Sequence, residues 1–182
     1  MIEVEVKAKI QDRETIKQAL IKRNARHLGT EVQRDHVYGF EGDFPPRDGG
    51  VIARIREKNG TCVLEFKEIN RKIGGVELAF AIPEVAGYDA FLAKLRFKQF
   101  FTMDKTRESY TLDGFTICLD QVKELGEFIE VEKMIESRSL KEKTRKECEA
   151  FLEELAPGTV VLYENYGDMI CTLRGIGNKK EK

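Results

Sequence analysis

Met1-Ile-Glu-Val-Glu-Val-Lys-Ala-Lys-Ile10 opens the chain and decides its fold. Apolar and charged residues alternate strictly along this stretch, and a period of two is typical of a β-strand with one buried face. The charged face is also ordered, because two acids, Glu3 and Glu5, precede two bases, Lys7 and Lys9. An ordinary solvated strand face mixes charges with Ser, Thr and Gln. The stretch therefore predicts a strand whose charged face has a role besides contact with solvent.

The alternation of apolar and charged faces returns five more times along the chain. Asn59-Gly60 and Asp113-Gly114 predict two tight turns, since these dipeptides favour the backbone of two-residue β-hairpin loops. Strands joined mostly by hairpins favour an antiparallel sheet. Eight strands are expected, at residues 1–10, 31–40, 51–58, 62–68, 76–82 (after Gly74-Gly75), 98–112, 115–122 and 128–133.

Helices are expected between and after the strands. Asp12 is placed to cap the first helix, because an Asp side chain accepts hydrogen bonds from the first free backbone N–H groups. Ser139 with Glu142 predicts a capping box for a long helix that stops at Pro157-Gly158. Another helix is expected after Pro83-Glu84, and a short one near residues 164–173. The stripes expected to be buried are Ile16, Ala19 and Leu20; Tyr88, Phe91, Leu92 and Leu95; and Cys148, Phe151, Leu152 and Leu155.

The composition is typical of one soluble, ion-rich domain. Among 182 residues, 31 bases nearly balance 32 acids, and the resulting net charge of -1 argues against a general nucleic-acid surface. No apolar run is long enough to span a bilayer, and no signal peptide is expected. The four cysteines are widely spaced, so a reducing cytoplasm is expected rather than zinc or disulfides. Residues 1–173 are expected to form the domain, and 174–182 a Lys-rich, disordered tail.

The repeated charged faces predict how the sheet is arranged. If helices cover the apolar faces, the charged faces must look at one another, as they do inside an antiparallel sheet that closes into a barrel. So many ions are not buried dry. We therefore expect an α+β fold, an eight-stranded antiparallel β-barrel with a wet tunnel and helices packed outside. The side chains expected in the tunnel are Glu3, Glu5, Lys7, Lys9, Arg54, Arg56, Glu65, Lys67, Glu77, Lys105, Arg107, Asp120, Glu130 and Glu132.

The expected tunnel contains an acidic set and a basic set of side chains. Carboxylates suit Mg2+ or Mn2+, and arginines at alternate strand positions can hold phosphate oxygens with their forks. A triphosphate bound along the bases and linked through metal to the acids satisfies both sets. The alternative is a ladder of cross-strand salt bridges, which contribute little at a surface. The candidate metal ligands are Glu3, Glu5, Asp120, Glu130 and Glu132, and the candidate triphosphate ligands are Lys7, Lys9, Arg54, Arg56, Lys67, Lys105 and Arg107.

The ordered motifs resemble those of the CYTH superfamily, the triphosphate tunnel metalloenzymes, and most of all its class IV adenylyl cyclase-like branch. The resemblance covers nearly the whole chain and agrees with the barrel expected above. It implies a divalent metal, a triphosphate substrate, and candidate catalytic roles for Glu5, Lys67, Glu77 and Asp120. The motifs are Glu3-x-Glu5-x-Lys7, Arg54-x-Arg56, Glu65-x-Lys67, Lys105-x-Arg107, Leu119-Asp120-x-Val122, Leu125-Gly126-x-Phe128-x-Glu130-x-Glu132 and Asn165-Tyr166.

One strand departs from the pattern of the family. It keeps Glu77 but has Ala79 and Ala81 where relatives often carry more charge, and Arg71 or Lys72 could supply the base that is missing. The departure bears on which triphosphate is handled.

Three functions remain open at this point. In a cyclase the 3′-hydroxyl of ATP attacks the α-phosphorus, which yields cyclic AMP and pyrophosphate. In a triphosphatase water attacks the γ-phosphorus of a nucleoside triphosphate, thiamine triphosphate or tripolyphosphate. A polyphosphate-binding module would only hold its ligand, although such capture needs no acidic set. The cyclase is preferred on resemblance, and the extent of the apolar strand faces predicts a homodimer.

Overall fold

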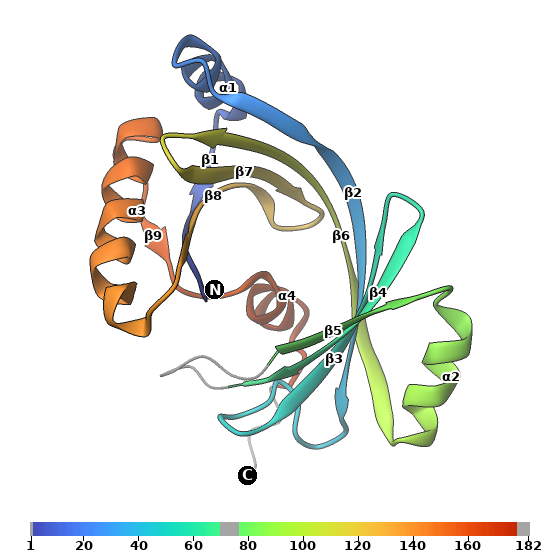
Figure 1. The fold of residues 1–182 in the computed structure, drawn as a ribbon. Coiled ribbons are helices and arrows are strands. Elements are labelled where there is room, and N and C mark those ends of the chain that lie inside the picture. Colours follow the sequence, from blue (N-terminus) through green and yellow to red (C-terminus); the bar gives the residue numbers. More distant parts are fainter. Residues whose placement is uncertain (1, 70–76, 178–182) are drawn as a thin grey trace. The chain divides into compact units, whose positions relative to one another are not determined.

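The computed structural model describes residues 2–69 and 77–177. Within these ranges, nine strands form one antiparallel sheet in the order β5-β4-β3-β2-β6-β7-β8-β1-β9, accompanied by four α-helices and one 3-10 helix (Figure 1). The strands are β1 (Ile2–Ile10), β2 (Arg26–Phe40), β3 (Val51–Lys58), β4 (Thr61–Glu68), β5 (Glu77–Ile82), β6 (Phe97–Leu112), β7 (Phe115–Val122), β8 (Gly126–Ile135) and β9 (Val161–Leu162). The helices are α1 (Arg13–Lys22), α2 (Ala86–Lys94), η1 (Arg138–Leu140), α3 (Lys141–Leu155) and α4 (Tyr166–Arg174).

The predicted α+β class and antiparallel sheet are confirmed. The sheet has nine strands in the described ranges rather than the predicted eight, because β9 is only two residues long and gives no alternating pattern. The barrel was predicted to be closed, but β5 and β9 are the ends of the hydrogen-bonded ladder in the described part of the chain. No helix in that part is both long and apolar enough to cross a bilayer.

The chain divides into two compact units, and each unit combines two stretches of sequence. Unit 1 comprises Met1–Glu31 and Lys105–Glu164, and unit 2 comprises Val32–Asp104 and Asn165–Lys182. The predicted strand opening at Gly74-Gly75, the bases Arg71 and Lys72, and the tail residues 178–182 lie outside the described residues.

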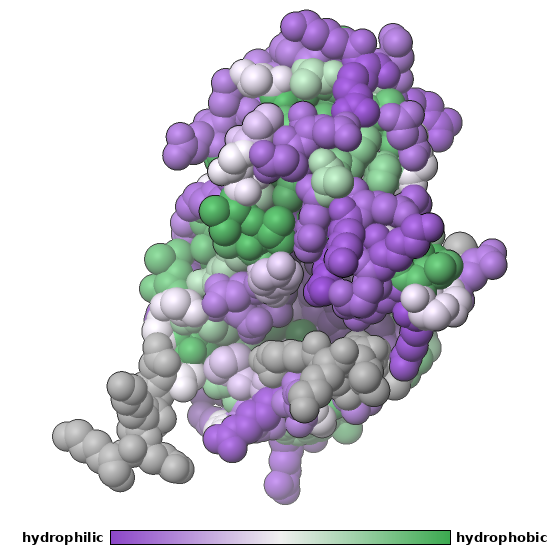
Figure 2. All heavy atoms as spheres, turned by 90° about the vertical axis from the view of Figure 1, so that its left-hand side faces the viewer, coloured by the Kyte–Doolittle hydropathy of each residue, from purple (hydrophilic) through white to green (hydrophobic). Residues whose placement is uncertain are grey.

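Unit 1 is built on the pairing of β1 with β8. The register runs antiparallel from Ile2 opposite Ile135 to Ile10 opposite Glu127. Helix α3 packs on these two strands and covers their apolar face, as the apolar stripe in the sequence predicts. On the side where α3 lies, hydrophilic side chains cover most of the surface, with hydrophobic ones in smaller areas (Figure 2). The buried core includes Val6, Ala8, Ile16, Leu20, Ile117, Leu119, Ile129, Val131, Cys148, Phe151, Leu152 and Leu155.

Unit 2 is built on the β3–β4 hairpin. Asn59 and Gly60 both have positive φ, 46° and 82°, as the predicted tight turn requires. A smaller core gathers Tyr38, Ala53, Ile55, Ile82 and Leu92. It does not include the whole stripe that was predicted for α2 or for the apolar face of β5. Phe91 is 54% exposed, Leu95 50%, Leu78 49% and Phe80 57%, whereas Leu92 is buried in this core and Tyr88 is partly buried against it.

Helix ends test the predicted caps. Asp12 accepts a hydrogen bond from the Thr15 backbone N–H at 3.0 Å, so the predicted cap of α1 is confirmed. The predicted capping box of Ser139 with Glu142 is wrong. Ser137 caps the short helix η1 by accepting from the Ser139 backbone N–H, and α3 follows η1 directly without a side-chain cap.

Candidate active site

The register of unit 1 brings charged residues together on one face of the sheet. Side chains of residues that lie opposite each other in an antiparallel pair share a face. Lys7 lies opposite Glu130, Glu5 opposite Glu132, and Arg107 opposite Asp120. Because β6, β7, β8 and β1 are neighbours in the sheet, these pairs form a continuous patch. We call it the Arg107 cluster; it consists of Glu3, Glu5, Lys7, Lys105, Arg107, Asp120, Glu130 and Glu132.

Arg107 lies at the centre of the cluster and contacts three carboxylates. Its Nε and Nη2 atoms donate to the two oxygens of Asp120 at 2.8 and 2.6 Å. Nη2 also contacts Glu130, and Nη1 donates to Glu132 Oε1 at 3.2 Å. Burial alone would lower the pKa of Arg107, but the hydrogen bond to Asp120 and the charge of Glu130 raise it. The guanidinium is therefore fully charged and held in a fixed plane.

Two lysines complete the basic part of the cluster. Lys7 Nζ is 3.1 Å from Glu130, and Lys105 Nζ is 3.2 Å from Asp120. Burial opposes ionisation of both acids, yet their basic partners, Arg107 first among them, hold the pKa of Asp120 and of Glu130 below its usual range. These two carboxylates are ionised at neutral pH and serve to hold the bases in place.

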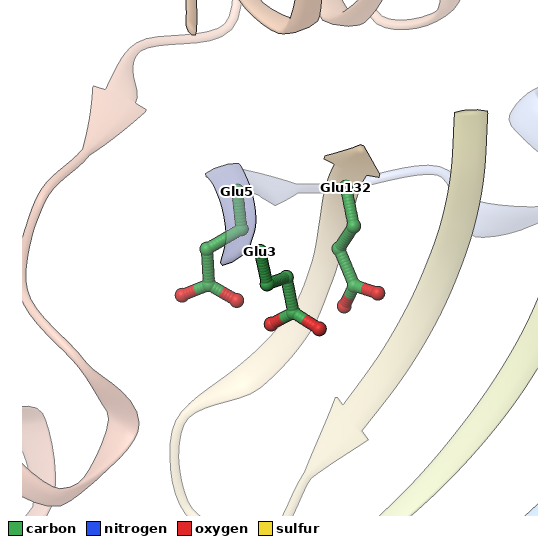
Figure 3. A group of neighbouring side chains, drawn as sticks. All are labelled: Glu3, Glu5 and Glu132. Carbon is green, nitrogen blue, oxygen red and sulfur yellow. The ribbon is translucent and has the colours of Figure 1, made fainter. Parts of the chain in front are cut away.

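Three carboxylates at one end of the cluster are compensated less: Glu132 accepts from Arg107 Nη1 at 3.2 Å, and Glu5 lies 3.8 Å from Lys7 Nζ. Figure 3 shows Glu3 and Glu5 from β1 beside Glu132 from β8, and their nearest ligand oxygens all lie within 4.8 Å of one another. Burial, together with the charges of Glu3, Glu130 and Glu5, raises the pKa of Glu132 to about 7. Burial and the neighbouring acid Glu130 also raise the pKa of Glu5.

This end of the cluster fits a divalent cation. The Arg107 cluster contains five carboxylates and three cationic side chains, so two negative charges are left over. Burial is the main cause of the raised pKa of Glu132, and the charges of Glu3, Glu130 and Glu5 add to it. Carboxylate oxygens are the ligands preferred by Mg2+ and Mn2+. Glu3, Glu5 and Glu132 are the residues that would hold such an ion.

Cys118 lies in the same cluster and was not predicted as a site residue. Its thiol donates to Glu132 Oε1 and also contacts Ser109 Oγ, each at 3.6 Å. Burial raises the pKa of Cys118 to about 12, so the sulfur stays protonated and is not a nucleophile. The only signal in the sequence was its alternation with Leu119 and Asp120, which sets Cys118 on the charged face of β7.

Unit 2 contains a second charged group, the Asp35 cluster, formed by Asp35, Arg54, Arg56 and Glu65. Arg56 donates from Nε and Nη2 to the two oxygens of Asp35, both at 2.7 Å. Arg54 contacts Glu65 through Nε and lies 3.5 Å from Asp35 through Nη1. The predicted side chains Arg54, Arg56 and Glu65 are thus brought together. Asp35, which is 1% exposed, was missed because the residues around it, Arg34 and His36, break the alternation of apolar and charged side chains.

The remaining predicted site residues lie outside both clusters. Lys67 Nζ is 3.1 Å from Glu77, and both side chains are well exposed, so this pair matches the cross-strand salt bridge of the alternative interpretation. Lys9 is exposed, and its amino group lies 5.9 Å from the centre of the Phe128 ring. Ala79 is opposite Glu65 in the β4–β5 register, and it brings no charge to that position.

Comparison with known families identifies the class of protein. The CYTH domain profile matches residues 1–162, so the chain belongs to the CYTH domain family. A protein of Methanocaldococcus jannaschii that carries a provisional adenylate cyclase name is 30% identical over 161 residues, which cover 85% of this chain and 90% of the relative.

Solved structures share the fold. A protein of Pyrococcus horikoshii is 27% identical, with a TM-score of 0.78 over 95% of this chain and 100% of the other. A Hippeastrum protein, provisionally an adenylyl cyclase and described as having a dominant triphosphatase activity, is 18% identical. Its TM-score is 0.63, and the match covers 96% of each chain. At that identity the likeness concerns the fold alone.

Proposed function

We propose that this protein carries out metal-dependent chemistry on a small-molecule triphosphate. The observation that carries the proposal is the Arg107 cluster, in which buried bases lie beside an excess of carboxylates. A mere salt-bridge ladder would pair each acid with a base, whereas here the surplus carboxylates gather at one end, where Glu132 is half-buried and Glu3 and Glu5 are exposed. A divalent cation supplies the missing positive charge, and the bases supply ligands for phosphate oxygens. Membership of the CYTH family supports the same class of ligand.

Each charged residue has a role in this proposal. Lys7, Lys105 and Arg107 bind phosphate oxygens of the triphosphate, and their partners Asp120 and Glu130 hold them in place. Asp120 is a weak proton acceptor because its pKa is lowered, so it acts by fixing Lys105 and Arg107. A divalent cation held by Glu3, Glu5 and Glu132 would neutralise phosphate charge and polarise the bond that breaks.

Further phosphate ligands are proposed in unit 2. Arg54 and Arg56 each present a planar fork, which matches phosphate better than a lysine does. The salt bridges of these arginines already fix their orientation. Lys67 and Glu77, which are paired and well exposed, are proposed to contact the substrate as well.

The preferred activity is that of an adenylyl cyclase. In this reaction the 3′-hydroxyl of ATP attacks the α-phosphorus, and pyrophosphate leaves. The bases would then hold the β- and γ-phosphates, whose charge grows as the bond to the α-phosphorus breaks. The name of the Methanocaldococcus jannaschii relative, which aligns with most of this chain, supports this choice.

The second candidate is a triphosphatase. The same bases and carboxylates would serve attack by water on the γ-phosphorus of a nucleoside triphosphate, thiamine triphosphate or tripolyphosphate. The Hippeastrum protein, which shares the fold and is described with a dominant triphosphatase activity, favours this candidate.

One product assay distinguishes the candidates. The purified protein is incubated with ATP and Mg2+ or Mn2+, and the products are separated by chromatography. We expect cyclic AMP and pyrophosphate. ADP and orthophosphate without cyclic nucleotide would establish the triphosphatase, with tripolyphosphate and thiamine triphosphate as the next substrates. Tight binding of ATP without turnover would indicate a binding module.

A matched pair of variants ties the assay to the site. Glu132→Gln should abolish turnover, because it removes a carboxylate from the proposed cation site. Glu136→Gln removes the same charge from an exposed position just beyond β8 and should leave turnover unchanged. Turnover in Glu132→Gln at the level of the parent protein would contradict the proposed cation site.

A further inference from the structure

Asp35 is a buried carboxylate that lies between two arginines. A buried carboxylate is costly unless cationic partners compensate for it, and this one is 1% exposed. Two of its partners, Arg54 and Arg56, are the arginines that we propose as phosphate ligands. The strand register enforces the arrangement, since Asp35 lies directly opposite Arg56 in the β2–β3 pair.

The contacts of Asp35 fix how the two arginines are turned. Arg56 meets it through Nε and Nη2 together, and this two-point contact sets both the position and the plane of the guanidinium. Arg54 is held from two sides, by Glu65 at Nε and by Asp35 at Nη1. Both forks are therefore oriented in the absence of any phosphate.

We propose that Asp35 is a positioning residue that orients Arg54 and Arg56 for a triphosphate. The proposal rests on the proposed function, because it assumes that these arginines are phosphate ligands. Asp35 affects an incoming anion in two opposite ways. Its negative charge repels phosphate, but because it already orients the two guanidinium groups, their side chains lose less conformational entropy when phosphate binds. Orientation prevails because two arginines already compensate the charge of Asp35.

The opposite signs of the two effects give a sharp test. If charge dominated, Asp35→Asn would tighten the binding of an anion, because it removes a negative charge beside two arginines. If positioning dominates, the same variant weakens binding. The probe is inorganic tripolyphosphate, and its affinity is measured by calorimetry with a metal chelator present and again with Mg2+. We expect Asp35→Asn to bind about tenfold more weakly in both conditions.

A matched control separates positioning from net charge. Asp104 pairs with Arg34 through a similar contact, 2.7 Å from Nε to Oδ1, but that arginine is well exposed. Asp104→Asn removes the same charge from the same unit and should keep the affinity of the parent protein within about twofold. Affinity in Asp35→Asn equal to or tighter than that of the parent would overturn the positioning role.

Two further outcomes are distinguishable. If Asp35→Asn does not fold, Asp35→Glu is measured instead, since it keeps the charge and displaces the carboxylate by one methylene. It should bind about threefold more weakly, because a fork held in the wrong place binds less well. Parent affinity in Asp35→Glu would then overturn the role of Asp35. Failure of the parent protein to bind tripolyphosphate in either condition would overturn the proposed function, and the role of Asp35 with it.

Discussion

At the scale of single residues, the molecule is distinguished by a carboxyl group that resists ionisation beside others that do not. Glu130 and Asp120 have arginine and lysine partners, and their pKa values are lowered. Glu132 receives one arginine contact but faces more acids than bases, and its pKa rises to about 7. Burial raises the pKa of both glutamates, but the charges of Arg107, Lys7 and Lys105 overcome it at Glu130, whereas Glu132 has Arg107 against Glu3, Glu130 and Glu5.

The raised pKa of Glu132 makes stability depend on pH. Its folded-state pKa lies above its ordinary value of 4.5, so the folded protein binds this proton more tightly than the unfolded chain. The resulting stabilisation is fully present below pH 4.5 and is lost as pH rises through about 7. Glu132→Gln should therefore raise the free energy of unfolding near pH 8 by roughly 1 to 3 kcal/mol, and change it little at acid pH.

Urea unfolding at both pH values, with a metal chelator present, checks this prediction. Glu136→Gln, at an exposed position, should show no such difference between the two pH values. A variant Glu132→Gln that is less stable than the parent protein near pH 8 would contradict the raised pKa of Glu132.

A second prediction concerns divalent cations. A ligand that binds only the folded state raises its melting temperature, and Mg2+ or Mn2+ should do so for the parent protein near neutral pH. Glu132→Gln should respond much less, because it lacks one of the three clustered carboxylates. Thermal unfolding across a titration of the cation measures the effect. Equal shifts in the two proteins would place cation binding elsewhere.

A third prediction concerns the centre of the cluster. Arg107→Met leaves Asp120, Glu130 and Glu132 without their shared partner. Removing one member of a buried ion network leaves uncompensated charge, so unfolding should become easier by about 3 kcal/mol near pH 7.5. Urea unfolding measures it. Arg34→Met breaks an exposed pair and should cost far less; equal losses in the two variants would argue against a buried network.

How much of the site could be predicted from the sequence depends on the residue. The eight members of the Arg107 cluster were predictable, because a period of two puts every second side chain on one face. Asp35 and Cys118 were not, since Asp35 stands in the polar run Gln33-Arg34-Asp35-His36, which does not alternate, and one small thiol has no recurring pattern. The exposed position of Lys9 could not be predicted either, because alternation gives the face of a strand and not the burial along it.

At the scale of elements, the features that could be predicted are those that a few neighbouring residues determine by themselves. The turns at Asn59-Gly60 and Asp113-Gly114 were predictable because the positive φ of all four residues suits Asn, Asp and Gly. β9 was not, because two residues pair with β1 only through tertiary context. The start of α3 shows the same limit. Ser137 and Ser139 are both good capping residues, and Ser137 is the cap because the short helix η1 precedes α3.

The caps give a prediction at this scale. Asn165 accepts from the Asp168 backbone N–H at 2.8 Å and caps α4. Asn165→Ala should therefore lower the free energy of unfolding by about 1 kcal/mol. Ser139→Ala should cost less than half of that, because Ser139 is not a helix cap in the structure. Denaturant unfolding of both variants is the measurement. A larger loss of stability for Ser139→Ala than for Asn165→Ala would indicate that the predicted capping box forms after all.

At the scale of the whole molecule, the homodimer expected from the sequence stays a prediction. Unit 2 supports it with apolar side chains that its own helices leave exposed, among them Leu78 and Phe80 on β5 and Phe91 on α2. Exposed apolar side chains of this size are common at interfaces between subunits.

We expect light scattering to give the mass of a dimer at micromolar concentration. Phe80→Glu should shift the protein towards monomer, because a buried interface would then contain an unpaired charge. Tyr163→Glu changes an exposed side chain of unit 1 and is the matched control. A monomeric parent protein, or a control as disruptive as Phe80→Glu, would contradict the prediction.

The pairing of β1 with β8 has a consequence for how the chain is made. On the ribosome, β1 is synthesised long before β8, yet Ile2 has to find Ile135. Until then the apolar face of β1 has no partner strand, and contacts so distant in sequence form slowly. Glu3 and Glu5 lie on β1 and Glu132 on β8, so no nascent chain that stops before β8 can assemble the three carboxylates. The three proposed cation ligands therefore come together only after β8 has been synthesised and has paired with β1.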